Sequence, residues 1–379
     1  MNHGRKRAAR SLRVVAAALA LPIAMTVGAS ASAADAGYHI VSTPNSGSGG
    51  LLALSCPAPT HCVAVGQSFK TGALIESSDG ATWSLATGAD TGTNSSLDGV
   101  SCPTANFCVA VGSTNGAILI ETWRGSAWTI ETSPNPANSS ANLQSVSCVS
   151  RSRCVAVGGF AATSTPLESR PLAESWDGTH WTLMKPPRPA RKASDLDAVS
   201  CPTATDCVAV GYANAPQSGD SVDAAALIEQ LHGSSWSMDT APDSGLDQTF
   251  LDDVSCVDRQ TCVAVGWGDP QRAVAMKLDG AVWSVTTTAT PHDRDLLQAV
   301  SCASATHCIA AGYQAGSVPV THVESFDGAV WTAVPSDNYP GANTNDLWGA
   351  SCPKHGRCFV AGFIRGIGLG ERTLVLTGR

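Results

Sequence analysis

The sequence predicts an all-β fold, a seven-bladed β-propeller with four-stranded blades, and three observations lead to this prediction. All fourteen cysteines fall into seven copies of one phrase: Ser-Cys, five residues, then Cys and an apolar run that ends in Gly. The copies begin 46 to 55 residues apart, a period typical of propellers, solenoids and arrays. Each copy holds four short β-type runs, and the two ends of the chain complement each other. Complementary ends favour a closed ring over an open solenoid.

The first 36 residues have the features of a secretory signal peptide, so we expect the propeller to occupy residues 37–379. Five basic residues between positions 5 and 13 precede an apolar stretch at 14–27. Overlapping Ala-x-Ala sites follow, with cleavage expected after Ala33 or Ala36. The stretch is shorter than the roughly 20 residues of a membrane helix. We therefore expect a secreted, extracellular protein with no membrane span once the signal is removed.

The mature chain is acidic. Loss of the leader removes five of the 23 basic residues and no acidic residue before Asp35, so 31 acidic side chains stand against 18 basic ones. Phosphate backbones and anionic membranes repel such a surface at long range. We expect no nucleic-acid partner.

The cysteines predict one disulfide bond per repeat. Export exposes thiols to oxidation, and an even count at regular spacing is typical of a disulfide framework. Zinc sites usually have two to four residues between paired ligands, whereas five separate each pair here. The expected bridges are Cys56–Cys62, Cys102–Cys108, Cys148–Cys154, Cys201–Cys207, Cys256–Cys262, Cys302–Cys308 and Cys352–Cys358.

The fourth copy shows how one blade is built. Residues 196–201 and 207–211 form two runs joined by a short loop, and residues 226–230 and 236–238 form the third and fourth. Turn-forming residues separate these runs, as expected for strands. The second run is small or apolar on both faces, as a strand between packed sheets requires. Its Ala209 and Gly211 leave room for a neighbouring sheet.

The turn between the third and fourth strands also repeats. Five copies have Asp-Gly or Arg-Gly there and one has His232-Gly233, and Gly favours a tight hairpin because it tolerates positive φ. A tryptophan stands three residues after each of these glycines, and we expect its indole to pack between adjacent sheets. These tryptophans are Trp83, Trp128, Trp181, Trp236, Trp283 and Trp331.

The seventh copy lacks this last run, and the missing run lies at the other end of the chain. Residues 374–379 end at the expected turn, while residues 38–42 resemble residues 128–132 of the second copy. We therefore expect the N-terminal strand to complete the last blade and close the ring.

One turn resembles a known motif. Residues 77–83, Ser-Ser-Asp-Gly-Ala-Thr-Trp, are similar to the Asp-box turn of sialidase-type (BNR-like) propellers, whose pattern is Ser-x-Asp-x-Gly-x-Thr-Trp. The present turn is one residue shorter between Asp and Gly, so the resemblance concerns the style of the turn. The whole repeat resembles secreted bacterial propellers with paired cysteines in each blade. The resemblance implies a structural turn within a propeller.

A first candidate site follows from the residue after the leucine that opens each first strand. This position holds Asp98, Gln144, Asp197, Asp252, Gln298 and Trp348 in copies two to seven. First strands are innermost in a propeller, so these side chains are expected to ring one mouth of the channel. Carboxylates suit calcium, which makes Asp98, Asp197 and Asp252 candidate ligands of a structural ion. The alternative is that they line a solvated channel.

A second candidate site consists of aromatic residues on the face that carries the irregular loops. Tyr212, Trp267, Tyr313 and Phe363 each follow the Gly that ends a second strand. Together with Trp348 they could form a platform for sugar rings or a peptide. The alternative is packing between blades.

Catalysis has little support in the sequence. Glutamates recur at one position in five copies, as structural residues do, and no motif pairs two carboxyl groups at glycosidase spacing. We therefore expect a monomeric binding module for an extracellular glycan or protein, with no required cofactor. A glycoside hydrolase or lyase of sialidase type on the same scaffold is the second hypothesis, and a structural cell-surface protein is the third. Fold alone does not decide among them.

Overall fold

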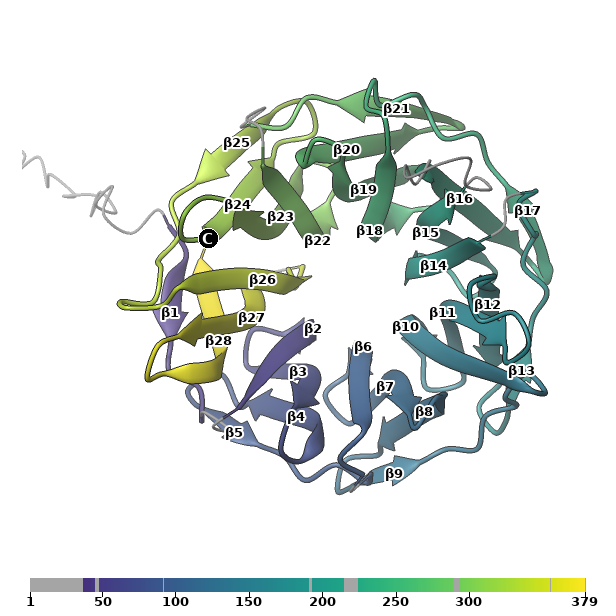
Figure 1. The fold of residues 1–379 in the computed structure, drawn as a ribbon, viewed down its shortest axis with the longest axis horizontal. Helices are drawn as coiled ribbons and strands as arrows, with labels where there is room; N and C mark the ends of the chain where they lie inside the picture. The colour runs from purple at the N-terminus through teal and green to yellow at the C-terminus, as the bar shows by residue number, and fades with distance from the viewer. Residues whose placement is uncertain are drawn as a thin grey trace, which may run out of the picture. The chain divides into compact units, whose positions relative to one another are not determined.

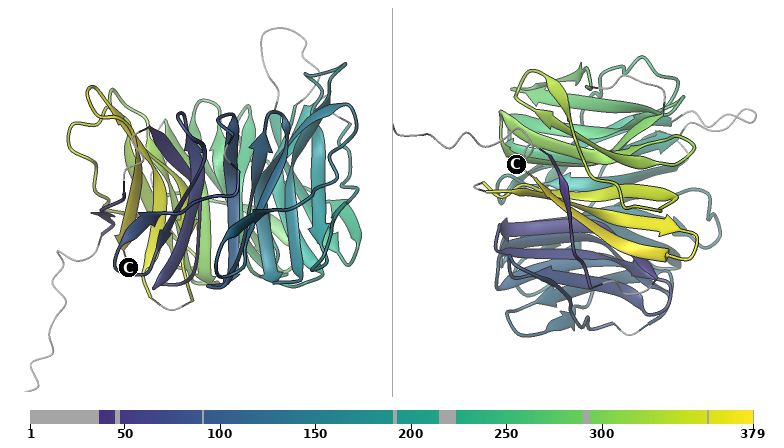
Figure 2. Two further views of the ribbon diagram at one scale, coloured as in Figure 1. Left: turned by 90° about the horizontal axis from the view of Figure 1, so that it is seen from below. Right: turned by 90° about the vertical axis from the view of Figure 1, so that its left-hand side faces the viewer.

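The computed structural model describes residues 37–44, 48–90, 92–190, 193–214, 224–289, 294–354 and 356–378. In the compact unit Ala36–Arg379, seven four-stranded antiparallel sheets stand around a central channel (Figure 1). Seen from the side, the strands run between the two faces of this unit (Figure 2). The predicted fold class is confirmed. The proposed leader lies outside the described residues. No helix in the described ranges is long and apolar enough to cross a membrane.

Blades 1 to 6 run outward from the channel in chain order. Blade 1 contains β2 (Gly49–Ala58), β3 (His61–Ser68), β4 (Gly72–Ser78) and β5 (Trp83–Leu85); blade 2 contains β6 (Ser95–Thr104), β7 (Phe107–Thr114), β8 (Ala117–Trp123) and β9 (Trp128–Ile130). Blade 3 contains β10 (Ser139–Ser150), β11 (Arg153–Ala162), β12 (Arg170–Trp176) and β13 (Trp181–Leu183); blade 4 contains β14 (Ala193–Ser200), β15 (Asp206–Asn214), β16 (Ala224–His232) and β17 (Ser235–Met238). Blade 5 contains β18 (Thr249–Asp258), β19 (Thr261–Gly268), β20 (Arg272–Asp279) and β21 (Val282–Thr286); blade 6 contains β22 (Asp295–Ser304), β23 (His307–Gln314), β24 (Val320–Phe326) and β25 (Trp331–Val334).

Blade 7 is built from both ends of the chain, as the sequence predicts. It contains β26 (Thr344–Ser351), β27 (Cys358–Gly366), β28 (Gly370–Gly378) and, outermost, β1 (His39–Val41). Strand β1 pairs antiparallel with β28, with Ile40 opposite Leu376. Tyr38, just before β1, is 1% exposed and belongs to the hydrophobic cluster between blades 6 and 7. Strand β1 therefore gives blade 7 its fourth strand and closes the ring.

The seven disulfide bonds connect the predicted partners, each within one blade. Their Cα–Cα distances lie between 4.0 and 4.3 Å, slightly below the roughly 4.4–6.8 Å usual for disulfide bonds. Each bond joins the first and second strands at the hairpin between them.

The serine of each Ser-Cys phrase links its blade to the next one. Ser200 Oγ accepts a hydrogen bond of 2.9 Å from the backbone N–H of Cys256, and Ser255 Oγ accepts one of 3.0 Å from Cys302. The same bond recurs at every interface, including the one where Ser351 of blade 7 accepts from Cys56 of blade 1. The repeated serine is therefore an inter-blade residue, a role that the spacing alone does not reveal.

Apolar side chains form one hydrophobic cluster at each of the seven interfaces between blades. The predicted packing of the tryptophans is confirmed, since four belong to these clusters and Trp83 and Trp236 pack against them. Trp128, Trp181, Trp283 and Trp331 are between 3% and 7% exposed.

Three of the repeated glutamates, Glu121, Glu174 and Glu324, also connect neighbouring blades. All five of the repeated glutamates are fully buried: Glu76, Glu121, Glu174, Glu229 and Glu324. The carboxylate of Glu121 accepts hydrogen bonds from the backbone N–H groups of Ala89 (2.8 Å) and Asp90 (2.9 Å), which follow the outer strand of the preceding blade. The Glu324 carboxylate accepts one from Ala289 in the same way. These contacts support the structural interpretation of the glutamates.

Candidate functional site at the channel mouth

A β-bulge interrupts the inner strand of every blade and places one residue toward the channel. In blade 4 the pairing with β15 shifts between Leu196 and Ala198, which leaves Asp197 without a partner opposite it. A bulge re-aims the side chain of its extra residue. The residues at the seven bulges are Leu52, Asp98, Gln144, Asp197, Asp252, Gln298 and Trp348.

The glycine that ends each second strand makes room for this bulge. A Cβ on Gly211 would lie 2.1 Å from the carbonyl oxygen of Asp195 in its own blade, and the other six glycines show the same contact at 1.9 to 2.1 Å. The sequence did not predict this contact within the blade, and room for a neighbouring sheet at Gly211 stays a prediction. The missing side chain of Gly211 accommodates the backbone of the adjacent inner strand.

All seven bulge residues line a single pocket of about 280 Å³ at the channel mouth. Gly99, Ser145, Ala198, Asp253 and Trp267 complete its lining. The structure thus brings together the ring of side chains that the sequence places at one register. Leu52 occupies this position in blade 1 and was not predicted.

Burial raises the pKa of the pocket carboxyl groups. The pKa of Asp98 rises to about 6 and that of Asp197 to about 7, in both cases chiefly because burial disfavours the charged form. The pKa of Asp252 is raised well above its ordinary value, first by burial and then by the negative charges of Asp197 and Asp253. A cation entering the mouth would relieve this repulsion.

Asp253 belongs to the pocket wall but has a partner for each carboxylate oxygen. Its side chain accepts hydrogen bonds from the backbone N–H groups of Val254 (2.8 Å) and, in the next blade, Val300 (2.7 Å). Most other blades have a small residue here, such as Gly99 or Ala198. Asp253 was not predicted. The available signal was an acidic residue at a position where the other repeats have small residues.

The carboxylates do not converge as tightly as ligands of one metal ion. Among the described residues, a single group of three His, Cys, Asp or Glu side chains has all its ligand atoms within 4.8 Å of one another: His307, Cys352 and Cys358. Two of these are joined in a disulfide bond, so they are not free thiolates. Calcium at the three aspartates therefore stays a prediction.

Two of the five predicted aromatic residues line the pocket. Trp267 does so from β19, and Trp348 does so from β26 with 40% of its surface exposed. Behind Trp267, Phe250 stacks at a ring distance of 4.5 Å, and Tyr212 lies 5.3 Å from Phe250. Tyr212 therefore supports the pocket wall from blade 4. Phe250 was not predicted because its contact with Trp267 crosses between two strands.

The other aromatic residues have different surroundings. Phe363 packs on the backbone of the next blade, since its ring lies 3.0 Å from where a Cβ on Gly50 would be. This contact matches the packing alternative. Burial raises the pKa of Tyr313, and so do the charges of Asp346 and Asp252. The Tyr212 hydroxyl donates a 3.0 Å hydrogen bond to Asp195, which fixes its ring.

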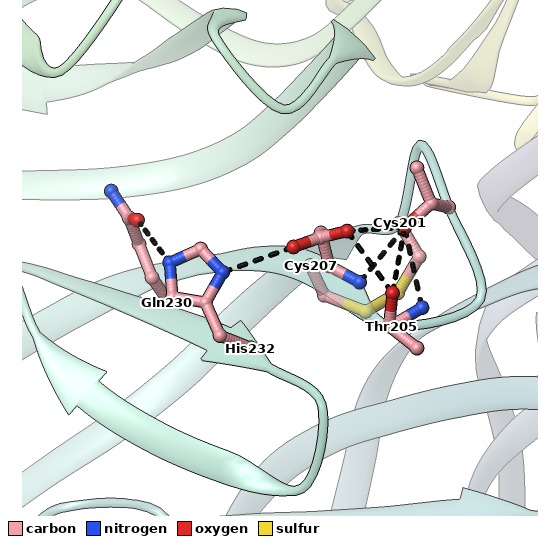
Figure 3. A network of polar contacts seen from close by, with 7 residues as sticks. Cys201, Thr205, Cys207, Gln230 and His232 are labelled. Atoms are coloured by element: carbon pink, nitrogen blue, oxygen red, sulfur yellow. Dashed lines mark hydrogen bonds and ion pairs between the residues drawn. A yellow bond between two sulfur atoms is a disulfide. The ribbon is translucent and has the colours of Figure 1, made fainter.

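The opposite face carries a His-Asp pair that lacks a nucleophile. His232 Nδ1 lies 3.0 Å from the Asp206 carboxylate and its Nε2 lies 3.1 Å from Gln230 Oε1 (Figure 3). The Thr205 hydroxyl donates to Asp206, so neither ring nitrogen of His232 activates it. The adjacent cysteines, Cys201 and Cys207, are joined in a disulfide bond. The described part of this loop therefore lacks the arrangement that nucleophilic catalysis requires.

Comparison with known proteins supports the architecture. No protein-family model matches the chain, and no curated protein matches it. Among solved structures it is similar to YCF48 bound to a D1 peptide, with a TM-score of 0.56 and 12% sequence identity over 92% of this chain and 99% of that one. It is also similar to YCF48 from Cyanidioschyzon merolae, with a TM-score of 0.56 and 14% identity over 90% and 99% of the two chains. Such low identity establishes likeness of fold alone.

Proposed function

We propose that this protein is a non-catalytic binding module whose channel mouth holds a basic side chain of a partner polypeptide. The observation that carries the proposal is the pocket itself, which is lined by two indoles and four aspartates, three of them bulge residues from different blades. Carboxylates attract a guanidinium or ammonium group, and indole faces favour cations. Aromatic anchors in partly enclosed pockets also dominate many protein interfaces.

Two further observations support a polypeptide ligand. The chain is acidic, with 31 acidic against 23 basic residues, so it attracts basic partners at long range. One structurally similar propeller is described as bound to a peptide. A glycan is the second ligand class, because indoles and carboxylates also suit sugar rings.

We further propose that the protein works outside the cytoplasm. Seven disulfide bonds, with no free cysteine among the described residues, support an oxidising compartment. Residues 1–36 also support export, because they have the basic start, apolar stretch and Ala-x-Ala sites of a secretory signal peptide.

Calorimetry with short peptides tests the ligand class. An acetylated Gly-Arg-Gly amide should bind, whereas the same peptide with citrulline, which has no charge, should bind at least about tenfold more weakly. Asp252→Asn and Trp348→Ala should each weaken the arginine peptide about tenfold. Asp279→Asn is the matched control, because it removes one exposed carboxylate on the other face without touching the pocket. Equal binding of both peptides would contradict the proposal.

A glycan array with the same protein separates the alternatives. If the wild-type protein retains a glycan and Trp348→Ala no longer does, the ligand of the pocket is a sugar and not a peptide. Incubation of the retained glycans followed by mass spectrometry would reveal the hydrolase or lyase, since cleavage products would appear.

A further inference from the structure

The interface between blades 7 and 1 lacks a large side chain that five other interfaces have. At the end of the third strand, directly opposite the tryptophan of the outer strand, those five blades carry Trp123, Trp176, Leu231, Leu278 and Phe326. Each belongs to or packs against the hydrophobic cluster that its blade shares with the preceding one. Blade 1 has Ser78 at this position, opposite Trp83.

A pocket of about 760 Å³ lies at this interface, which we call the seam pocket. Its lining includes Ser78 and Trp83 from blade 1 and Val41 and Phe359 from blade 7. Trp83 is half-buried, whereas its equivalents in four other blades are at most 7% exposed. The size is within the range of small-molecule pockets, roughly 300–1,000 Å³. The walls therefore present apolar surface that the corresponding interfaces cover with their own side chains.

One charged side chain lines the seam pocket. Arg357, from the hairpin loop of blade 7, is exposed, and no carboxylate is paired with it in the described part of the chain. The other polar groups at the rim are hydroxyls, among them those of Thr60 and Thr82. A guanidinium beside an apolar wall favours a ligand with a carboxylate next to an apolar body.

We propose that the seam pocket binds a small aromatic carboxylic acid. Its ring would occupy the space that Trp123 and Trp176 take at their own interfaces, against Trp83 and Phe359. Its carboxylate would pair with Arg357. The seam pocket shares no residue with the channel mouth, and its charged group is basic whereas those of the channel mouth are acidic. The two proposals can therefore be tested independently.

Saturation-transfer NMR on the complete mature protein, with indole-3-acetate as the probe, tests the proposal. Indole-3-acetate should bind and tryptamine, which has the same ring but a positive charge, should bind at least about fivefold more weakly. Arg357→Gln should weaken indole-3-acetate about fivefold, as expected for an exposed charge pair. Arg153→Gln, which is exposed and directly precedes the second cysteine of blade 3 as Arg357 does in blade 7, is the matched control and should change nothing.

Ser78→Trp should abolish the signal because it restores the side chain that blades 2 and 3 carry. If the tryptophan at position 78 prevents folding, Ser78→Leu is the second variant. It introduces the leucine that blades 4 and 5 carry at this position and should also weaken binding. The proposal is overturned if indole-3-acetate gives no transfer at millimolar concentration, if Ser78→Leu binds as well as the wild type, or if tryptamine binds equally well.

Discussion

At the scale of single residues, the channel mouth contains groups that oppose folding. Asp252 is flanked by two other carboxyl groups, and its pKa is raised well above the ordinary value by burial and by Asp197 and Asp253. Such a group retains its proton in the folded state over a range of pH where the unfolded chain has lost it. Stability therefore falls as the pH rises through that range. Residues that reduce stability and line a pocket are characteristic of binding sites.

Asp252→Asn should separate these two effects. At pH 8 the amide removes a buried negative charge, so the melting temperature should rise by about 3 °C while binding of the arginine peptide weakens about tenfold. At pH 5 the gain in melting temperature should shrink, because the raised pKa leaves the wild-type carboxyl group less charged there than at pH 8. Scanning calorimetry at both pH values measures this. A fall in melting temperature at pH 8 would show that the carboxylate stabilises the fold.

The repeated glutamates give a second contrast between residues. Glu121 accepts two backbone hydrogen bonds, whereas both carboxylate oxygens of Glu229 lack a partner. One of the two donors is lost through the sequence of the preceding blade: Ala89 donates its N–H to Glu121, but Pro187, at the same distance after the tryptophan, has no N–H. Burial then raises the pKa of Glu229 to about 8.

Glu121→Gln should therefore cost about 2 kcal/mol of unfolding free energy, since charged acceptors of two amides are lost. Glu229→Gln should change it by less than about 0.5 kcal/mol at pH 7, where Glu229 is already largely protonated. Urea unfolding of both variants provides the comparison. Equal losses of unfolding free energy in the two variants would mean that the hydrogen bonds of Glu121 do not stabilise the fold.

At the scale of strands, the bulge and its facing glycine form one unit. The bulge aims a side chain into the channel, and the glycine on the second strand admits the displaced carbonyl group. A side chain at this glycine must move the backbone of the inner strand, so the cost is large.

Gly211→Ala should destabilise the protein by about 3 kcal/mol or more, because a Cβ would meet the Asp195 carbonyl oxygen. Gly233→Ala is the control: φ is positive at +65°, but nothing lies within 4 Å of its Cβ position. It should cost about 1 kcal/mol, for the backbone conformation alone. Thermal unfolding distinguishes the two, and a smaller loss for Gly211→Ala would contradict the proposed role of the glycine.

These strand-level features mark how far the sequence leads. The cysteine phrase, the repeated turns and the complementary ends predict the fold, the disulfide bonds and the strand that closes blade 7. The leucine register also places Asp98 and its equivalents in one ring. The bulge itself depends on the backbone pairing, and the contact of Phe250 with Trp267 depends on two strands meeting in space. The seam pocket had a signal in the sequence, since Ser78 stands where five other repeats have large residues.

At the scale of the whole molecule, buried carboxyl groups govern the response to pH. Burial raises the pKa of Glu174, Asp197 and Asp346 to about 7 each, and their penalty on the folded state grows as the pH rises from about 4 to 7. The Asp-Gly turns act in the opposite direction. Backbone N–H groups donate to Asp177 and lower its pKa to about 2, so its contribution is present above about pH 4 and is lost below.

The two sets together predict a stability maximum in mildly acidic solution. The melting temperature should be about 5 °C higher at pH 5 than at pH 8, at constant ionic strength, and should fall again below about pH 3 as the turn aspartates gain protons. A double variant, Asp197→Asn with Asp252→Asn, should flatten the slope between pH 5 and pH 8, because it removes two of the groups that retain protons. A melting temperature that rises from pH 5 to pH 8 would mean that the channel-mouth carboxylates are stabilised as anions, as they would be if a tightly held cation remained among them. Dialysis against EDTA at pH 8 separates these cases: a bound metal ion would be lost and the melting temperature would drop, whereas the organic-cation pocket proposed for the channel mouth would be unaffected.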